Sequence, residues 1–303
     1  RYNFFCICQK KIVLLHAFMK KNAYLYRVRT WLRHYLTAWN TGGEGVHSPY
    51  LFEWVRMVMS DKYAYRIWND IERVRAQMLT SKEVVEFVDY GSAKKLRSLE
   101  NGTEAAYSVE LRDTRRVKDI AKRSLAKAKY AQMLFRLVNW LGHQLRKDDE
   151  GLTIVELGTS LGVTTAYMAG VDARDKVYTY EGCEAVAKIA RDNWKALGIN
   201  NIECRIGAIN GEILKDCLER VDIAFVDANH TYEASLEYFN VLADKVHEKS
   251  VIVMDDIYHS EEMEKAWKEI CEDERVTTTI DLYQMGLVFF DKHYWKRNYR
   301  MRL

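Results

Sequence analysis

Proline is nearly absent from this chain of 303 residues, which contains only Pro49, whereas about 5% is usual. The sequence therefore has no proline-rich linker, no PxxP ligand, and no catalytic motif that requires a proline after residue 49. It also lacks the run of about 18 apolar residues that a membrane-spanning helix needs. Because 48% of the residues are hydrophobic and 29% are charged, we expect a globular protein without integral membrane association.

Cysteines are few, and none of them belongs to a CxxC pair or to a spacing with histidine that suits zinc. Zinc ribbons and disulfide scaffolds are thus excluded, and reduced thiols predict a cytoplasmic protein. The six cysteines are Cys6, Cys8, Cys183, Cys204, Cys217 and Cys271.

Acidic residues are missing from the first 43 positions, which contain eight lysines and arginines. The remainder has a net charge of −5, since the whole chain carries +3, and this argues against a nucleic-acid groove across it. The basic segment either contacts nucleic acid or an anionic membrane, or forms an amphipathic helix that packs its aromatic stripe on the protein body. We favour the packed helix. The stripe consists of Tyr24, Tyr26, Trp31, Tyr35 and Trp39.

Helical spacing dominates the first part of the chain. Helices are predicted from residue 24 to about 79, interrupted by the glycine cluster at 41–45. A short strand at 84–88 and a polar loop at 91–102 follow, and apolar residues then keep helical spacing from 115 to 145. We divide the chain into an N-terminal basic helical region, 1–114, expected to cover the substrate, and a second domain, 115–303.

After residue 151, short β-branched runs alternate with helical stretches. The predicted strands are 153–157, 176–180, 201–206, 221–226 and 250–254, and the predicted helices are 163–171, 183–197, 210–218, 232–247 and 260–272. Two further strands, 276–283 and 287–290, predict an antiparallel hairpin. The expected fold class is α/β: a doubly wound, Rossmann-like, mostly parallel sheet that ends in that hairpin.

A glycine-containing loop follows the first of these strands, with the sequence Glu156-Leu-Gly158-Thr159-Ser160-Leu-Gly162. Glycines between a strand and a helix let the backbone approach a ligand and direct amide groups toward it. The spacing is neither GxGxxG nor a Walker loop. Glu181 ends the second strand, where a carboxylate accepts both ribose hydroxyls of an adenosine cofactor.

These motifs resemble the class I S-adenosylmethionine-dependent methyltransferases over about residues 115–292. The E-x-G-x-x-x-G pattern, with Ser160 in its middle, is most similar to the cation-dependent O-methyltransferases of the catechol, caffeoyl-CoA and macrocin types. One departure is Gly207-Ala208-Ile209, which lacks an acidic residue for the adenine amino group and leaves Asn210 as a substitute. The resemblance implies a cofactor site made of Glu156, Gly158, Thr159, Ser160, Gly162, Glu181, Gly182, Ala208 and Asp227.

Carboxylates end the fourth and fifth strands, at Asp227 and at Asp255-Asp256. In a parallel sheet both ends reach the same edge, where converging carboxylates attract Mg²⁺ or another divalent cation. The resemblance implies a metal site at Asp227, Asp255 and Asp256; the alternative is that Asp255 or Asp256 caps the next helix. His230 occupies the position of the catechol enzymes' catalytic lysine, so His230 and Asp227 are the predicted catalytic residues. A loop-bonding role for His230 stays open.

The lone proline also bears on the methyl acceptor. Amine-methylating nucleic-acid enzymes carry a D/N-P-P-Y/F motif after the fourth strand, and cytosine-carbon methylases use a Pro-Cys loop; neither fits a chain whose proline is Pro49. The favoured acceptor is a small-molecule hydroxyl.

Alternatives are an RNA or protein methyltransferase docking through the basic segment, a non-catalytic binding protein, and a nicotinamide-dependent oxidoreductase. The missing GxGxxG weighs against the last of these. A homodimer is an open expectation.

Overall fold

The computed structural model describes residues 23–38, 46, 48–89, 111–210, 219–293 and 295–303. Most of the basic segment, the glycine cluster, the loop at 91–102 and the helix expected at 210–218 lie outside these ranges.

The first part of the described chain is helical, as the spacing predicts. Ser48 caps one of these helices by accepting a hydrogen bond from the backbone amide of Leu51, with Pro49 in the first turn, where its missing amide costs nothing. A two-stranded antiparallel sheet follows. The elements are α2 (Ala23–Thr37), α3 (Pro49–Trp54), the π-helix η1 (Val55–Met59), α4 (Arg66–Thr80), β1 (Val84–Asp89) and β2 (Leu111–Arg116).

The rest of the chain builds an eight-stranded sheet with the order β10-β8-β9-β7-β6-β3-β4-β5. Five neighbouring strands run parallel, in the order β7-β6-β3-β4-β5. Strand β9 pairs antiparallel with both β7 and β8. The mostly parallel sheet and the terminal hairpin are thereby confirmed. The strands are β3 (Thr153–Leu157), β4 (Lys176–Glu181), β5 (Ile202–Ile206), β6 (Val221–Val226), β7 (Val246–Asp255), β8 (Thr278–Asp281), β9 (Met285–Phe289) and β10 (Arg297–Arg300).

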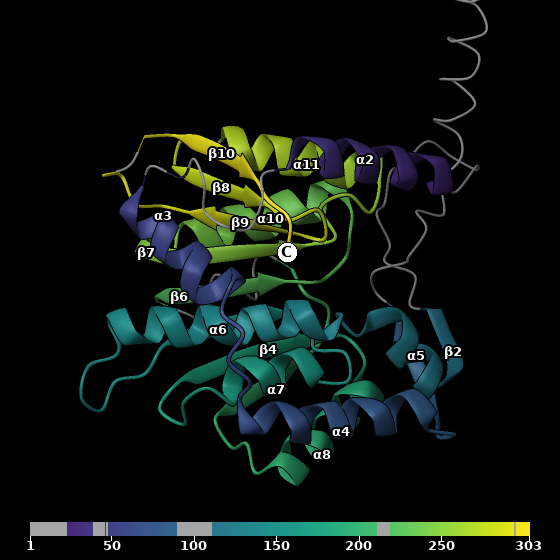
Figure 1. The fold of residues 1–303 in the computed structure, drawn as a ribbon. Coiled ribbons are helices and arrows are strands. Elements are labelled where there is room, and N and C mark those ends of the chain that lie inside the picture. The colour runs from purple at the N-terminus through teal and green to yellow at the C-terminus, as the bar shows by residue number, and fades with distance from the viewer. Residues whose placement is uncertain (1–22, 39–45, 47, 90–110, 211–218, 294) are drawn as a thin grey trace, which may run out of the picture.

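Helices cover both faces of this sheet (Figure 1). On one face α3, η1 and α6 pack over side chains such as Ile154 and Val251, with α4, α7 and α8 beside them. On the other face α10 and α11 pack over Val155 and Ile252. Alternate residues of one strand therefore enter two separate cores, as in a doubly wound fold. The helices are α5 (Val117–Ser124), α6 (Ala128–Leu145), α7 (Val163–Ala169), α8 (Glu184–Leu197), α10 (Tyr232–Ala243) and α11 (Glu261–Glu272).

Two predictions about these elements are wrong. The single helix expected over 115–145 is two helices, α5 and α6, because Leu125 has an extended backbone and Lys127 precedes α6 with ψ 142°. The helix expected over 232–247 ends at Ala243, since the chain must enter β7 beside β6. Strand β10 was not expected; it pairs parallel to β8.

Helix α2 lies beside α11 at one end of the sheet (Figure 1). The Tyr26 hydroxyl donates to Glu264 Oε2 over 2.8 Å, and Arg33 donates to Glu264 Oε1 over 2.8 Å. The predicted packing of the aromatic stripe is correct for Tyr26 only, because Tyr24, Trp31 and Tyr35 are exposed. Trp39 lies outside the described residues. Within those residues, no helix has the length and apolarity to cross a membrane.

The expected division of the chain at residue 114 stays a prediction. In the described structure α3 and η1 share a core with α6, while β2 leads directly into α5.

Candidate active site

The carboxyl ends of β3, β4, β6 and β7 meet at one edge of the sheet, because these strands are parallel neighbours. A cavity of about 800 Å³ opens there. Nine of the residues predicted from the sequence line it: Gly158, Ser160, Glu181, Gly182, Ala208, Asp227, His230, Asp255 and Asp256.

Gly158 brings the glycine loop against the end of β6. Its φ is +96°, and a Cβ there would stand 2.1 Å from the Asp227 carbonyl oxygen. The Asp227 amide in turn donates to the Leu157 carbonyl over 2.8 Å. Only glycine permits this backbone approach, so the loop and Asp227 share one cavity wall.

Strained backbone concentrates at the same place. Ser160, Asn229 and Asp256 line the cavity with φ values of 49°, 46° and 51°. Residues other than glycine rarely adopt this left-handed region, and such strain clusters at ligand sites.

Glu181 ends β4 and points into the cavity beside the glycine loop. Its Oε2 accepts from the Ser160 amide over 2.8 Å, and its Oε1 accepts from the Cys183 amide over 2.9 Å. Burial nevertheless raises the pKa of Glu181 above its usual value. Each carboxylate oxygen retains a second lone pair, so the carboxyl group is oriented and able to accept the hydroxyls of a ribose.

Three other predicted cofactor residues do not line the cavity and instead support the loop from behind. Thr159 is buried with its hydroxyl 2.5 Å from that of Thr179. Gly162 precedes α7 with φ +73°, and the indole nitrogen of Trp194 donates to its carbonyl over 2.7 Å.

Glu156 is the third of these residues and is fully buried. The hydroxyls of Thr165 and Thr179 donate to its Oε2, and burial raises its pKa to about 8. Its Oε1 has no hydrogen-bond partner among the described residues, and such an orphaned acceptor is expected to find a ligand or a water.

The expected adenine region also reaches the cavity, which is lined by Ala208 and Asn210. The Gly207 amide donates to the Glu181 carbonyl over 3.0 Å and so joins this turn to the end of β4. The prediction that Asn210 replaces the missing acidic residue is therefore compatible with its location.

Two Asp–His pairs face each other across the ends of β6 and β7. His230 Nε2 lies 3.4 Å from Asp227 Oδ1, and His259 Nδ1 lies 3.4 Å from Asp256 Oδ2. The two imidazole rings are stacked with centroids 5.5 Å apart. Burial opposes protonation of His230, but Asp227 and Asp256 outweigh it and raise the pKa of the imidazole. An imidazole held in this way is a suitable proton acceptor.

Asp255 lies deeper than Asp227 and Asp256. Burial and the two neighbouring carboxylates raise its pKa well above the usual range, and its Oδ1 has no hydrogen-bond partner among the described residues. The pKa of Asp256 is lowered instead: burial opposes this, but His259, His230 and Arg27 outweigh it.

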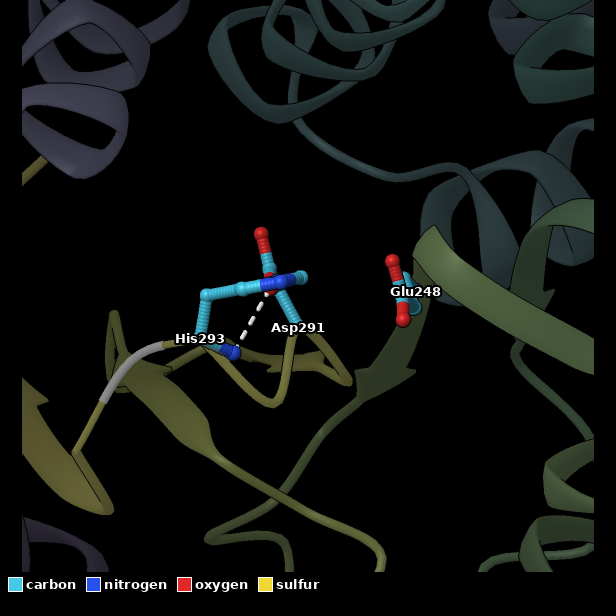
Figure 2. Close-up of side chains that lie close together, drawn as sticks. All are labelled: Glu248, Asp291 and His293. Atoms are coloured by element: carbon cyan, nitrogen blue, oxygen red, sulfur yellow. Dashed lines mark hydrogen bonds and ion pairs between the residues drawn. The ribbon is translucent and has the colours of Figure 1, made fainter.

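Among the described residues, Asp227, Asp255 and Asp256 do not bring their ligating atoms within 4.8 Å of one another. A group that does so consists of Glu248, Asp291 and His293. Figure 2 shows that group, in which the rings and carboxylates are exposed or half-buried near the other end of β7. Asp291 accepts from both the backbone amide and the ring of His293, so its carboxylate already closes a local turn.

Sequence reasoning missed several residues that line the cavity or contact the residues lining it. Ser124 and Tyr130 line it because the chain breaks between α5 and α6; the Ser124 hydroxyl lies 2.6 Å from that of Ser160. No glycine or proline at 125–127 marks that break. His259 had a signal, because Asp256-x-x-His259 repeats the spacing of Asp227-x-x-His230. Arg27, whose Nη2 lies 2.9 Å from His259 Nδ1, had none.

Comparisons with known proteins agree with this arrangement. A family model described as a methyltransferase domain matches residues 155–257, a range that contains all of the predicted cofactor, catalytic and metal residues. No curated protein matches the sequence.

Three of the solved structures to which this chain is similar are methyltransferases by their descriptions. A protein from Klebsiella pneumoniae assigned as an O-methyltransferase is 13% identical, with 78% of this chain and 94% of that chain covered and a TM-score of 0.50. An O-methyltransferase from Bacillus cereus in complex with S-adenosylhomocysteine is 21% identical, with coverages of 55% and 83% and a TM-score of 0.46. The O-methyltransferase TomG from Streptomyces achromogenes in complex with S-adenosylmethionine is 16% identical, with coverages of 55% and 82% and a TM-score of 0.46.

The first of these likenesses supports the fold of the whole sheet, and the family model supports the chemistry of its central part. The family model shows a methyltransferase domain within residues 155–257, and the glycine loop and Glu181 both lie inside that range.

Proposed function

We propose that this enzyme transfers a methyl group to a hydroxyl of a small molecule. The observation that carries the proposal is the Asp227–His230 pair, which lines the same cavity as Glu181 and the glycine loop. A hydroxyl must lose its proton as its oxygen attacks a methyl group, and an imidazole is suited to accept that proton near neutral pH.

The residues of the cavity fit S-adenosylmethionine. The Glu181 carboxylate is oriented by two backbone amides and has lone pairs for ribose hydroxyls. The absence of a side chain at Gly158 lets the glycine loop pass directly against Asp227 at the cavity wall. The bound cofactor supplies an electrophilic methyl group on a positively charged sulfur.

His230 takes the proton in the proposed mechanism. Asp227 orients its Nε2 and stabilises the imidazolium that forms. The stacked ring of His259 restricts the His230 imidazole, and Arg27 contacts His259 from the side of α2. Orientation of the acceptor hydroxyl between His230 and the methyl group contributes much of the acceleration.

Whether a divalent cation binds at Asp227, Asp255 and Asp256 is a separate part of this proposal. The buried Asp255 Oδ1, which lacks a partner among the described residues, favours a cation. The pairing of Asp227 with His230 and of Asp256 with His259 opposes it, because both carboxylates already face a histidine. We derive no step through a cation. Full turnover after removal of divalent ions with excess EDTA would exclude it, whereas loss of turnover that Mg²⁺ restores would support it.

Free thiols support a cytoplasmic location, since Cys183, Cys204 and Cys271 form no disulfide within the described chain. The remaining three cysteines lie outside the described residues. A homodimer stays a prediction.

The decisive experiment measures S-adenosylmethionine binding by calorimetry, followed by transfer of a labelled methyl group to a panel of phenols, catechols and sugars. We expect binding and transfer to oxygen. Absence of binding would leave a non-catalytic protein, and transfer only to RNA, protein or amines would refute the hydroxyl acceptor.

A further inference from the structure

The outer face of α2 is apolar and faces away from the protein. Its side chains recur at helical spacing and are between 37% and 78% exposed. The opposite face carries Tyr26, Thr30 and His34, which are buried against α11 and β8. The exposed stripe consists of Tyr24, Val28, Trp31, Leu32, Tyr35 and Leu36.

Such a continuous stripe differs from the scattered apolar residues of an ordinary surface. The rings of Trp31 and Tyr35 stack with centroids 5.4 Å apart, and the Arg302 guanidinium lies 4.5 Å from the Tyr35 centroid. Aromatic side chains flanked by cations are typical of the boundary between lipid headgroups and acyl chains.

The sequence that contains the stripe is basic. The first 43 residues contain eight lysines and arginines and no acidic residue. Lys20 and Lys21 precede α2, and Arg29 lies on it between the stripe and the buried face. A helix with one apolar face and basic flanks binds in the plane of an anionic membrane surface, and each cation near that surface contributes independently.

We propose that the outer face of α2 docks this enzyme peripherally on an anionic lipid surface. RNA would pair with the cations but leaves the apolar side chains Val28, Leu32 and Leu36 without a role. A second copy of the chain would cover the stripe but adds a second basic sequence of the same charge.

Docking of this kind would place the membrane close to the active site. Arg27 belongs to α2 and contacts His259, whose ring stacks on His230. The Tyr283 hydroxyl donates to the Arg27 carbonyl over 2.9 Å and joins the same helix to the loop before β9. The proposal is independent of the chemistry in the cavity, because lipid binding can be measured without turnover.

The experiment is flotation of the full chain with phosphatidylcholine vesicles and with vesicles that also contain phosphatidylserine. We expect binding to the anionic vesicles only. The double variant Trp31→Gln, Leu36→Gln should weaken this binding at least tenfold, and Lys20→Gln with Lys21→Gln should weaken it roughly 25-fold, about fivefold for each cation.

Trp295→Gln is the matched control, because Trp295 is 93% exposed but lies before β10, outside the stripe. This variant should bind as the parent does. Unchanged binding of the stripe variant, equal binding to neutral vesicles, or absence of binding to either vesicle would each overturn the proposal. So would a dimer that the stripe variant dissociates, or a preference for RNA over anionic vesicles.

Discussion

A methyl group on Gly158 would stand 2.1 Å from the carbonyl oxygen of Asp227, so these two residues are in direct backbone contact. The contact joins the exit of β3 to the exit of β6. It brings the loop proposed to hold the cofactor against the residue proposed to orient the base, His230. The geometry of both parts therefore depends on the absence of one side chain.

Gly158→Ala is expected to lower both stability and cofactor affinity. The strained backbone costs about 1–3 kcal/mol, and the overlap with Asp227 costs roughly 1–3 kcal/mol more. Gly198→Ala is the matched control, because Gly198 also has a positive φ but open space around its Cα, so it incurs only the backbone cost of about 1–2 kcal/mol. Urea unfolding and calorimetry measure the two effects; equal destabilisation by both variants would contradict the close contact.

Glu181→Gln is expected to weaken S-adenosylmethionine binding about 10- to 100-fold, since hydrogen bonds to a charged group contribute about 1.5–3 kcal/mol. Calorimetry gives the dissociation constant, and circular dichroism checks that the variant keeps the fold of the parent. Glu203→Gln, an exposed change on the adjacent strand β5, serves as the control and should bind normally. An unaltered affinity in Glu181→Gln would rule out the ribose assignment.

His230→Ala is expected to reduce kcat by about 10²- to 10⁴-fold, the usual contribution of a general base, while cofactor affinity stays the same. His259→Ala should cause a smaller loss, because His259 restricts the ring of His230 without taking the proton. His293→Ala, at the exposed group of Figure 2, should have no effect. A normal kcat in His230→Ala would mean that another group accepts the proton.

The packing of α2 against α11 is expected to weaken at low pH. Burial by itself would raise the pKa of Glu264, but Lys268, Arg33 and Tyr26 lower it to about 2. A carboxyl group with a lowered pKa contributes stability that is present above its unfolded value near 4.5 and is lost as the pH falls toward 2.

Glu264→Gln should therefore destabilise the protein by about 1–3 kcal/mol at pH 7 and flatten the dependence of stability on pH between 5 and 2. Glu262→Gln changes an exposed carboxyl group of the same helical turn and should leave that dependence intact. Thermal unfolding across this pH range distinguishes the two. Parallel curves for Glu264→Gln and the parent would contradict the proposed contribution.

Much of the α/β fold after residue 151 is predictable because its signals are local. Apolar runs separated by amphipathic helices indicate the parallel sheet, and the positions of Glu156, Gly158 and Glu181 follow from the strand ends. The break between α5 and α6 is not predictable in this way. Leu125 to Lys127 carry no helix-breaking residue, and the chain leaves the helix there at the wall of the cavity.

The Asp-x-x-His spacing occurs twice in the sequence, but the sequence does not show how far apart the two pairs lie in the fold. The pairs at Asp227 and Asp256 become one stacked cluster only because β6 and β7 are neighbours in the sheet. The predicted metal site at Asp227, Asp255 and Asp256 also depends on adjacent strand ends. The order of elements in the sequence predicts that adjacency, but it does not predict the direction of each carboxylate.

The sequence by itself determined the α/β order, the position of the glycine loop and the sheet edge at which the chemistry is expected, since periodicity and glycine spacing act within a few residues. Only the tertiary structure decided that Arg27 contacts His259, that Tyr26 and Arg33 hold Glu264, and that the outer face of α2 stays uncovered by α11. Those contacts join residues more than 230 positions apart, and no local pattern encodes which distant surfaces meet when the chain buries its apolar side chains.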